Sequence, residues 1–581
     1  MKSQDYRYLL FPSTRTGNGT GHLRRCFRLS RALGPDALVV LHEADTPGHF
    51  SREQLQRLLS LETAEVPVVY ALPSEGGVTI LDNRETDEKL FSGLLSRGPV
   101  IALDEGGSPR RRASLVLDTL PRLDGDDAAN LRSPGLLDLP NPVSAVQRGV
   151  LVTFGGEDPA HLTEKMVRAL VPEFYPPEAV TVIRPALAEA PKLPAGMMLL
   201  EPRSDIKEHL GEYELVCCSF GLTAYEACAA GTAVLLFNPS RYHSRLSRAA
   251  GFPEAGVKNL KAGRIGRFLS RPEDLLRRCS ALVPKERLSL AEAISRYDFT
   301  APRGCPVCGR LDNPAVARLP SATFFRCNAC SLVYREEYSG RKENYQGDYF
   351  FKEYRDHYGK TYLEDFNQIA AMASPRLRII QKLLPKGNGR PRLLDVGCAY
   401  GPFLKEAAAA GFDCRGIDLS DDAAAHVTRD LGIPAQAVSF EDFVENPTES
   451  ERFDVITLWF VIEHFHDLSR VLEKVHRLLV PGGVLAFSTP NLHGISGRKN
   501  LPAFLKASPE DHRSVFSPAS AKKVLEGRGL SLARIRITGH HPERFPSQGA
   551  LRLPEGAYAA VSRLFHLGDT FEAYAVKTGS P

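Results

Sequence analysis

Four cysteines near the middle of the chain have the type and spacing of a metal site. Cys305 and Cys308 form one C-x-x-C pair, Cys327 and Cys330 form a second, and eighteen residues separate the pairs. Two such pairs predict one tetrahedral site with four thiolate ligands, each about 2.3 Å from a zinc ion. Because thiolates would fill every position, we predict a structural zinc ribbon over residues 303–335. The alternatives are two redox pairs or a ribbon that has lost its metal.

A second set of residues has the pattern of a nucleotide-type cofactor site. Asp395 ends an apolar run and leads into a turn with Gly397 and Gly401, after which a helix is expected. Glycines at a strand-to-helix turn let a ligand approach the backbone, and the helix start offers free N–H groups. Asp418 ends the next apolar run, where a carboxylate accepts hydrogen bonds from ribose hydroxyls in doubly wound folds.

Further residues follow in the order of a known family. Glu441 and Asp442 come after a third predicted strand, residues 453–464 suggest a fourth strand and its exit, and Pro481 begins the turn before a fifth. Together with the glycine turn, they resemble the class I S-adenosylmethionine-dependent methyltransferases over residues 391–578. Ubiquinone-pathway O-methyltransferases and sugar C-methyltransferases share this layout. The resemblance implies S-adenosylmethionine as cofactor, bound by Asp395, Gly397, Gly401, Asp418, Glu441 and Asp442. A glycine loop alone could serve another nucleotide.

His464 follows the fourth predicted strand, where the acceptor would meet the cofactor. Methyl transfer is an in-line displacement, so the enzyme orients the acceptor and, where needed, removes its proton. We predict His464 as that base, with a structural histidine as the alternative. For His493 and His512 we expect structural or surface roles.

The N-terminal region carries another glycine turn, which ends in a histidine. Gly19, Gly21 and His22 lie between a predicted strand and a predicted helix, and Arg24 and Arg25 follow. A helix N-terminus disfavours an imidazolium, so His22 should be neutral and able to accept a proton. The two arginines could face phosphate.

Similar groups surround later strand ends. Gly155, Gly221, Thr223 and Glu226 supply glycine, hydroxyl and carboxylate groups that suit a nucleotide diphosphate and its ribose. With the His22 turn, they resemble the nucleotide-sugar hydrolases of the pseudaminic-acid pathway over residues 5–260. That resemblance implies a GT-B pair of Rossmann-like domains and His22 as the base that activates water against a UDP-sugar. The residues it assigns to the nucleotide sugar are Gly21, Arg24, Gly155, Gly221, Thr223 and Glu226.

Parts of the N-terminal region depart from that family. Residues 105–149 and those after 250 match no pattern of it, and Asp82 with Asn83 matches its acidic site only loosely. A hydrolase, a glycosyltransferase, a nucleotide-sugar-binding module and a degenerate scaffold therefore all remain open.

The elements that must position these residues alternate between strand and helix, which predicts an α/β fold with parallel, doubly wound sheets. Residues 120–149 are rich in Pro, Gly and Asp and predict a linker. The expected organisation is 1–140 and 150–300 as the two GT-B domains, 303–335 as the ribbon, 336–390 as a helical linker or lid, and 391–578 as the methyltransferase domain. Strands in the first two are expected at 6–13, 37–43, 78–82, 100–105, 150–155, 180–184, 215–219 and 233–237.

Composition narrows the setting. The 581 residues are 43% hydrophobic and 24% charged, as in ordinary soluble proteins, and the net charge of +4 without long like-charged runs argues against nucleic acid as a partner. No signal peptide is evident, and the apolar stretch 215–237 indicates strand, helix and strand rather than a membrane span. Eleven cysteines without a dense framework suit the reducing cytoplasm. The oligomeric state is not predicted.

The two resemblances suggest one function. A ribbon before a methyltransferase domain, with aromatic residues at 345–351, resembles C-methyltransferases that act on deoxysugar nucleotides. We therefore predict a bifunctional enzyme of nucleotide-sugar or surface-glycan biosynthesis that methylates a sugar-linked acceptor and binds or processes a UDP-sugar. The alternative is a small-molecule O-methyltransferase with a non-catalytic N-terminal module. The acceptor atom and the sugar stay open.

Overall fold

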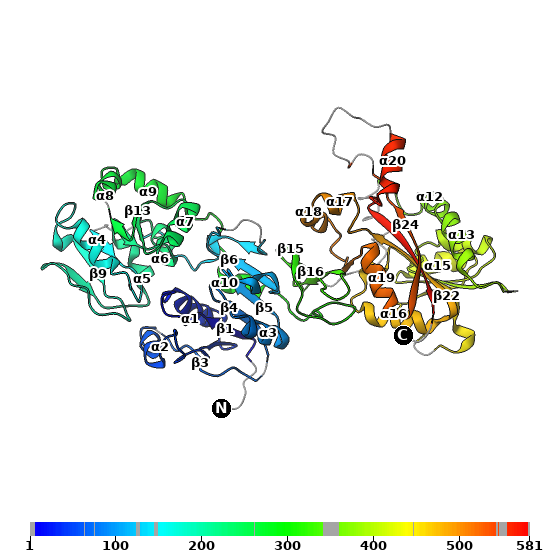
Figure 1. The fold of residues 1–581 in the computed structure, drawn as a ribbon, viewed down its shortest axis with the longest axis horizontal. Helices are drawn as coiled ribbons and strands as arrows, with labels where there is room; N and C mark the ends of the chain where they lie inside the picture. The colour runs from blue at the N-terminus through cyan, green and yellow to red at the C-terminus, as the bar shows by residue number, and fades with distance from the viewer. Residues whose placement is uncertain are drawn as a thin grey trace. The chain divides into compact units, whose positions relative to one another are not determined.

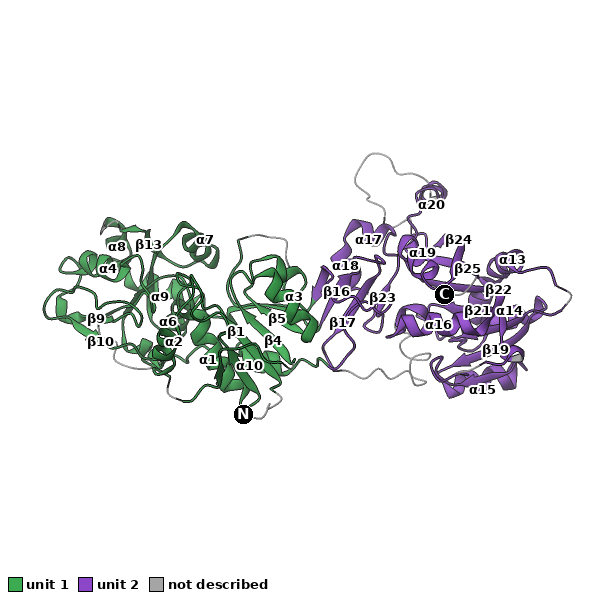
Figure 2. Cartoon of the chain, turned by 60° about the horizontal axis from the view of Figure 1, so that its bottom comes forward, with its two compact units in different colours: residues 1–299, 319–321 green, residues 300–318, 322–581 purple. Residues whose placement is uncertain are grey.

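The computed structural model describes residues 6–62, 64–74, 76–123, 128–143, 149–260, 262–340, 359–387, 389–444, 447–541, 544 and 555–578 (Figure 1). The chain divides into two compact units, coloured green and purple in Figure 2. Unit 1 holds residues 1–299 and 319–321, and unit 2 holds residues 300–318 and 322–581.

The first half of unit 1 is a seven-stranded parallel sheet in the order β3-β2-β1-β4-β5-β6-β7. The chain starts at the central strand β1 and builds first toward one edge and then toward the other, which is the doubly wound arrangement. Every residue of β1, β2, β4, β5 and β6 is buried, as expected for parallel strands covered on both faces. The strands are β1 (Tyr8–Pro12), β2 (Ala37–Val40), β3 (Val68–Val69), β4 (Val78–Asp82), β5 (Val100–Leu103), β6 (Leu115–Asp118) and β7 (Leu131–Arg132). The helices are α1 (Gly21–Leu33), α2 (Arg52–Leu59), α3 (Glu88–Arg97), η1 (Ser108–Arg111) and η2 (Pro134–Leu136).

The second half of unit 1 has a sheet in the order β10-β9-β8-β11-β12-β13-β14, parallel except for the last pair. Its strands are β8 (Val150–Val152), β9 (Val180–Ile183), β10 (Met198–Leu200), β11 (Leu215–Cys218), β12 (Ala233–Asn238), β13 (Glu254–Val257) and β14 (Asn259–Leu260). Its helices are α4 (Leu162–Leu170), η3 (Pro177–Ala179), α5 (Ile206–His209), η4 (Leu210–Glu212), α6 (Leu222–Ala229), α7 (Arg241–Ala250), α8 (Ala262–Leu269), α9 (Pro272–Ser280) and α10 (Leu290–Ser295).

The predicted strands of unit 1 are present, but the predicted linker is only partly right. The described part of residues 120–149 contains β7, which pairs with β6, and the short helix η2. Leu137 in this stretch is buried in the core of the second half. The final helix α10 packs against α1 of the first half, so the two halves are not cleanly divided in sequence.

The main sheet of unit 2 has the order β20-β19-β18-β21-β22-β25-β24. Its first five strands are parallel, and β25 runs antiparallel to both β22 and β24. The strands are β18 (Arg392–Val396), β19 (Asp413–Asp418), β20 (Ala435–Ala437), β21 (Phe453–Trp459), β22 (Leu479–Pro490), β24 (Leu530–Thr538) and β25 (Thr570–Lys577).

Helices accompany this sheet, and α19 is an example of a helix that begins at residues with a known preference for a helix start. Ser517 caps α19 by accepting a hydrogen bond from Ser520 N–H, and Pro518 occupies the first helical position. The helices are α12 (Phe366–Ala371), α13 (Ala373–Leu383), α14 (Pro402–Ala409), α15 (Asp421–Asp430), η6 (Glu449–Glu451), η7 (Ile462–His464), α16 (Leu468–Leu478), α17 (Ile495–Lys499), α18 (Leu501–Lys506), α19 (Pro518–Glu526) and α20 (Glu555–Leu564).

The cysteine pairs belong to a small antiparallel sheet that is joined to the rest of unit 2. Strands β15 (Ala315–Leu319), β16 (Ala322–Arg326) and β17 (Val333–Glu337) continue into β23 (Ser514–Val515), which pairs with β17. One hydrophobic core runs from Cys305 and Tyr334 to Phe487 and Phe516. The aromatic residues at 345–351 lie outside the described residues. Within the part of the chain that the structure describes, no helix is long and apolar enough to cross a membrane.

Candidate functional site

The glycine turn after β18 depends on residues without a side chain. Gly397 and Gly401 have φ values of 68° and 77°, in the left-handed region that favours glycine. A Cβ on Gly397 would lie 2.5 Å from Val461 Cγ2, and one on Gly401 would lie 2.8 Å from Val427 Cγ2. Any larger residue at either position would therefore displace the turn or its neighbours.

Asp418 lies at the carboxyl end of β19, beside this turn. Its Oδ2 accepts a hydrogen bond from Ala399 N–H at 2.8 Å, and its Oδ1 accepts one from Ser420 N–H at 2.9 Å. Burial raises the pKa of this carboxyl group. Each carboxylate oxygen keeps a second lone pair, so Asp418 can hold the turn and still accept hydrogen bonds from ribose hydroxyls.

Asp395 lies in β18 and its carboxylate accepts a hydrogen bond from Thr457 Oγ1 on β21 at 2.6 Å. The side chain is buried, and this burial raises its pKa to about 7. Its carboxylate lies between β18 and β21, where its hydrogen bond to Thr457 joins the two strands beneath the glycine turn. The predicted contact of Asp395 with a cofactor stays a prediction.

Exposed residues continue this edge of the sheet. Leu419, directly after Asp418, is 55% exposed, which suits the apolar face of a bound base. Sequence reasoning missed Leu419, although a large apolar residue next to a strand-end acid was a usable signal. Glu441 and Asp442 are also exposed, and Asp442 accepts a hydrogen bond from Ser439 Oγ at 2.7 Å.

The exit of β21 brings together two histidines and two acids. His464 Nδ1 lies 3.1 Å from Asp511 Oδ2, and the rings of His464 and His512 pack edge to face with centroids 4.8 Å apart. Glu463 is fully buried, and this burial raises its pKa to about 7. Ligand atoms of Glu463, His464 and His512 lie within 4.8 Å of one another, so this group could also hold a cation.

His512 therefore lies beside the predicted base in a partly buried position, which fits a structural rather than a surface role. Burial and the neighbouring His464 lower its pKa to about 4, so His512 is neutral near pH 7. The distance of 48 residues between the two histidines hid this contact from sequence reasoning.

The four cysteines converge in unit 2. Their sulfurs all lie within 4.8 Å of one another, and the Cys305–Cys330 and Cys308–Cys327 pairs are each 3.5 Å apart. A tetrahedron of thiolates at about 2.3 Å from zinc has sulfurs about 3.8 Å apart. The donor set and its spacing therefore fit a zinc ion.

In unit 1, one cavity of about 830 Å³ is lined by all seven residues predicted for the nucleotide-sugar site. The carboxyl ends of β1, β8 and β11 supply them, where ligands bind in open α/β sheets. The seven are Gly21, His22, Arg24, Gly155, Gly221, Thr223 and Glu226.

His22, at the start of α1, is oriented by a carboxylate that the sequence only loosely indicated. Its Nδ1 lies 2.7 Å from Asp82 Oδ1, and Arg25 donates to both oxygens of Asp82 at 2.5 and 2.7 Å. Burial acts to raise the pKa of Asp82, but Arg25 and His22 outweigh it and hold that pKa well below its usual range. In the neutral form of the His22 imidazole, an ionised Asp82 favours the tautomer with its proton on Nδ1, and Nε2 is then an acceptor.

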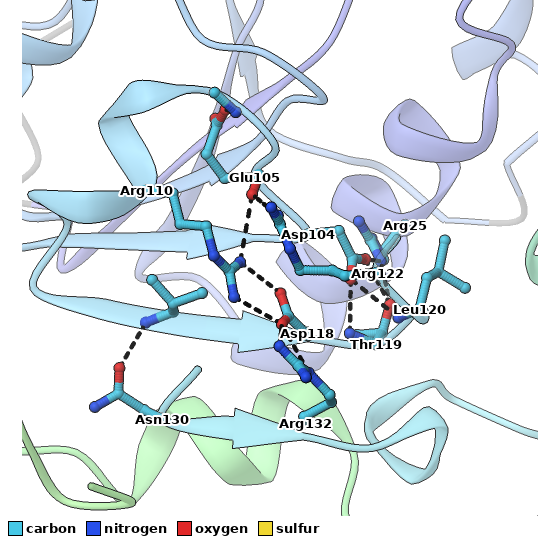
Figure 3. Close-up of polar contacts among 12 residues, drawn as sticks. Arg25, Asp104, Glu105, Arg110, Asp118, Thr119, Leu120, Arg122, Asn130 and Arg132 are labelled. Carbon is cyan, nitrogen blue, oxygen red and sulfur yellow. Dashed lines mark hydrogen bonds and ion pairs between the residues drawn. The ribbon is translucent and has the colours of Figure 1, made fainter. Parts of the chain in front are cut away.

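Arg25 does not face a phosphate, so that expectation is wrong. Its NH1 donates to Asp104 Oδ2 at 2.6 Å and to Thr119 Oγ1 at 2.7 Å (Figure 3). Asp104 in turn accepts hydrogen bonds from the N–H groups of Thr119 and Leu120. Four of the five N–H donors of the guanidinium are thus used within the protein, and the group holds Asp82 in place.

Arg24 and Glu226 take different positions on the cavity wall. Burial and the nearby Arg28 lower the pKa of Arg24, whose side chain forms no hydrogen bond or ion pair with another described residue. Glu226 is buried, and its Oε1 accepts a hydrogen bond from Arg28 NH1 at 2.5 Å. The guanidinium of Arg24 is therefore available to an anionic ligand, whereas the carboxylate of Glu226 is held by Arg28.

The main sheet of unit 2 defines a class of protein. Five parallel strands in this order, an antiparallel last strand, a glycine turn after the first strand and an acid after the second are those of the class I methyltransferase fold. The glycine turn, the Asp418 lone pairs and the exposed Leu419 fit S-adenosylmethionine.

Comparisons with known proteins agree. The family model described as "Methyltransferase domain" matches residues 366–535. The ubiquinone biosynthesis O-methyltransferase of Actinobacillus pleuropneumoniae serotype 7 (strain AP76) is 38% identical over 135 residues, which are 22% of this chain and 56% of that relative. The enzyme of the same name from Coxiella burnetii (strain Dugway 5J108-111) is 31% identical over 179 residues, 29% of this chain and 74% of that relative.

Two solved structures are also similar. A SAM dependent methyltransferase from Archaeoglobus fulgidus is 14% identical with a TM-score of 0.30, covering 39% of this chain and all of its own. The magnesium protoporphyrin IX methyltransferase from Synechocystis PCC 6803 with bound SAH is 17% identical with a TM-score of 0.28, covering 40% and 97%. The chain spans little more than half the length of the first relative named above. Through unit 2, the chain belongs to the S-adenosylmethionine-dependent methyltransferases.

Proposed function

We propose that the protein is a bifunctional enzyme of nucleotide-sugar or surface-glycan biosynthesis. Unit 2 would transfer a methyl group to a sugar-linked acceptor, and unit 1 would bind and hydrolyse a UDP-sugar or transfer its sugar. The observation that carries the proposal is the cavity of unit 1, where His22 is oriented by Asp82 beside the strand ends of two doubly wound halves.

In unit 1, the residues themselves suggest the chemistry. Asp82 keeps the proton of His22 on Nδ1, so Nε2 can take a proton from water or from an acceptor hydroxyl. Arg24 would meet the diphosphate, because it is a largely enclosed cation without a protein partner among the described residues. The glycines at 21, 155 and 221 would let the nucleotide approach the backbone.

The test of unit 1 is the release of UDP from a panel of UDP-sugars by the full-length protein. His22→Ala should abolish release, and His243→Ala is a matched control because His243 lines the same cavity without contact to Asp82. UDP release at the full rate by His22→Ala would refute the role of His22. Absence of UDP release by the wild type would leave unit 1 as a binding module or scaffold.

In unit 2, S-adenosylmethionine when bound supplies an electrophilic methyl group. Gly397, Gly401 and Asp418 would hold it at the turn, with Glu441 and Asp442 near its base. His464, held by Asp511, would take the proton from an acceptor hydroxyl. Incubation with S-adenosylmethionine and a panel of nucleotide sugars, followed by mass spectrometry, should reveal a product heavier by one methyl group. If no nucleotide sugar of the panel is methylated, this result would count against a sugar-linked acceptor.

We further propose that the four cysteines hold one structural zinc ion. All four sulfurs would be ligands, so the ion would stabilise the fold and leave catalysis to other residues. The described cysteines form no disulfide, which is compatible with the proposed reducing cytoplasmic setting.

The names of the relatives favour a second candidate function. Both curated relatives are called ubiquinone biosynthesis O-methyltransferases, so unit 2 could methylate the hydroxyl of a small aromatic acceptor while unit 1 only binds or scaffolds. Methylation of a catechol probe, together with no methylated sugar nucleotide, would favour this alternative.

A further inference from the structure

A carboxylate occupies the glycine turn that precedes His22. Gly17 N–H donates to Glu157 Oε1 at 2.9 Å, and Gly19 N–H donates to Glu157 Oε2 at 2.8 Å. Each oxygen thus takes one amide, and the turn holds the carboxylate with two charge-assisted hydrogen bonds. Glu157 follows β8, so it reaches the turn from the other half of unit 1.

The shape of the turn is suited to an anion. Gly17 and Gly19 have φ values of 84° and 78°, and a Cβ on either would meet no atom within 4 Å. Successive amides that converge in this way form a concave site for anionic oxygens. Arg15 and Arg24 line the same cavity and would add positive charge for such a ligand.

The two loops also touch through apolar and small groups. A Cβ on Gly156 would lie 2.6 Å from Thr20 Cγ2, so only glycine allows this approach. The contact of Glu157 with the turn is therefore part of the cavity wall at the place where the two halves meet.

We propose that the turn of Gly17 and Gly19 is an anion-binding subsite for a phosphate group, and that Glu157 is its internal competitor. A phosphate that enters the turn replaces the Glu157 carboxylate on the same two amides. Repulsion between the two anions then drives the Glu157 side chain out of the turn. The identity of the phosphate as part of a UDP-sugar rests on the proposed function of unit 1, whereas the competition does not.

A purely structural role for Glu157 predicts the opposite outcome. If the carboxylate only ties the two loops together, its loss would loosen the cavity wall and weaken any ligand held there. If it competes with the ligand, its loss would free the amides and strengthen binding.

The experiment is titration calorimetry of the full-length protein with two probes, UDP and inorganic pyrophosphate. Removal of a competitor that fills the turn in most molecules should lower the apparent Kd of Glu157→Gln and Glu157→Ala by about tenfold, because affinity scales with the fraction of available sites. Glu85→Gln is the matched control, since Glu85 is an exposed acid on the same cavity wall. A thermal melt of each variant checks that it is folded.

The outcomes are distinct. Tighter binding of both probes by the two Glu157 variants, but not by Glu85→Gln, supports the proposal. Tighter binding of pyrophosphate without any binding of UDP supports the subsite and counts against a UDP-sugar as ligand. Unchanged or weaker binding of both probes, or an equal gain in Glu85→Gln, overturns it.

Discussion

Replacement of Asp395 by asparagine should stabilise unit 2 at alkaline pH. The asparagine side chain has the same size and keeps an oxygen to accept the hydrogen bond of Thr457, but it cannot ionise. In the wild type, burial raises the pKa of Asp395 to about 7, well above the value of about 3.9 expected in the unfolded chain. The folded protein therefore binds this proton more tightly than the unfolded chain does.

The sign and size of the effect follow from linkage. A folded-state pKa above the unfolded value gives stability that is present at low pH and is lost as pH rises from about 4 to about 7. Each tenfold change in an ionisation constant is worth ~1.4 kcal/mol, so the ionised Asp395 costs about 4 kcal/mol at pH 8. The advantage of Asp395→Asn over wild type should thus widen by about 3 kcal/mol between pH 5 and pH 8.

The chain offers a direct assay. Trp459 is the single tryptophan of the 581 residues and lies at the end of β21, with Phe403 edge to face at 5.1 Å. Its fluorescence during urea unfolding therefore reports unit 2 alone. Asp413→Asn, at an exposed position of the neighbouring β19, is the control and should show no such pH dependence. An Asp395→Asn advantage that stays constant or shrinks from pH 5 to pH 8 would refute the reasoning.

Three further outcomes are expected. Asp418→Asn should weaken S-adenosylmethionine binding about 10- to 100-fold by calorimetry, because charge-assisted hydrogen bonds worth ~1.5–3 kcal/mol each are lost; unchanged affinity would contradict the ribose role. Gly397→Ala should lower the urea midpoint of the Trp459 signal, since the added Cβ would overlap Val461, and a second change, Val461→Ala, should restore part of the loss. Equal midpoints for Gly397→Ala and for the double variant would contradict this contact. Elemental analysis should find about one zinc per chain. Cys308→Ser or a strong chelator should remove the zinc and lower the urea midpoint of the Trp459 signal, because the cysteines share a core with the main sheet. A wild-type protein that contains no zinc would exclude the metal site.

Local patterns predicted most of the fold. The long buried strands and the glycine turns at Gly21 and Gly397 are encoded by neighbouring residues, so their types and places could be read directly. The strand β6 was missed, because it lies within residues 105–149, which match no pattern of the family that the region resembles. The two-residue strand β23 was missed for a different reason, since it pairs only with the distant β17.

The sites could be predicted only in part, because their key contacts join distant segments. His22 meets Asp82 across 60 residues, and Glu157 meets Gly17 across 140. The error on Arg25 was avoidable, however. His22 and Arg25 are three positions apart and share one face of α1, so one acid such as Asp82 could be expected to contact both side chains.

The pairing of β17 with β23 determines how unit 2 can be divided into fragments without exposing its core. A fragment that begins at residue 391 would lack β17 and would expose Phe516 and neighbouring apolar side chains to water. A fragment of unit 2 that begins near residue 300 should therefore be more stable than one that begins at residue 391. The cysteine-bearing sheet thus shields part of the methyltransferase core from water, and removal of the sheet should destabilise that core.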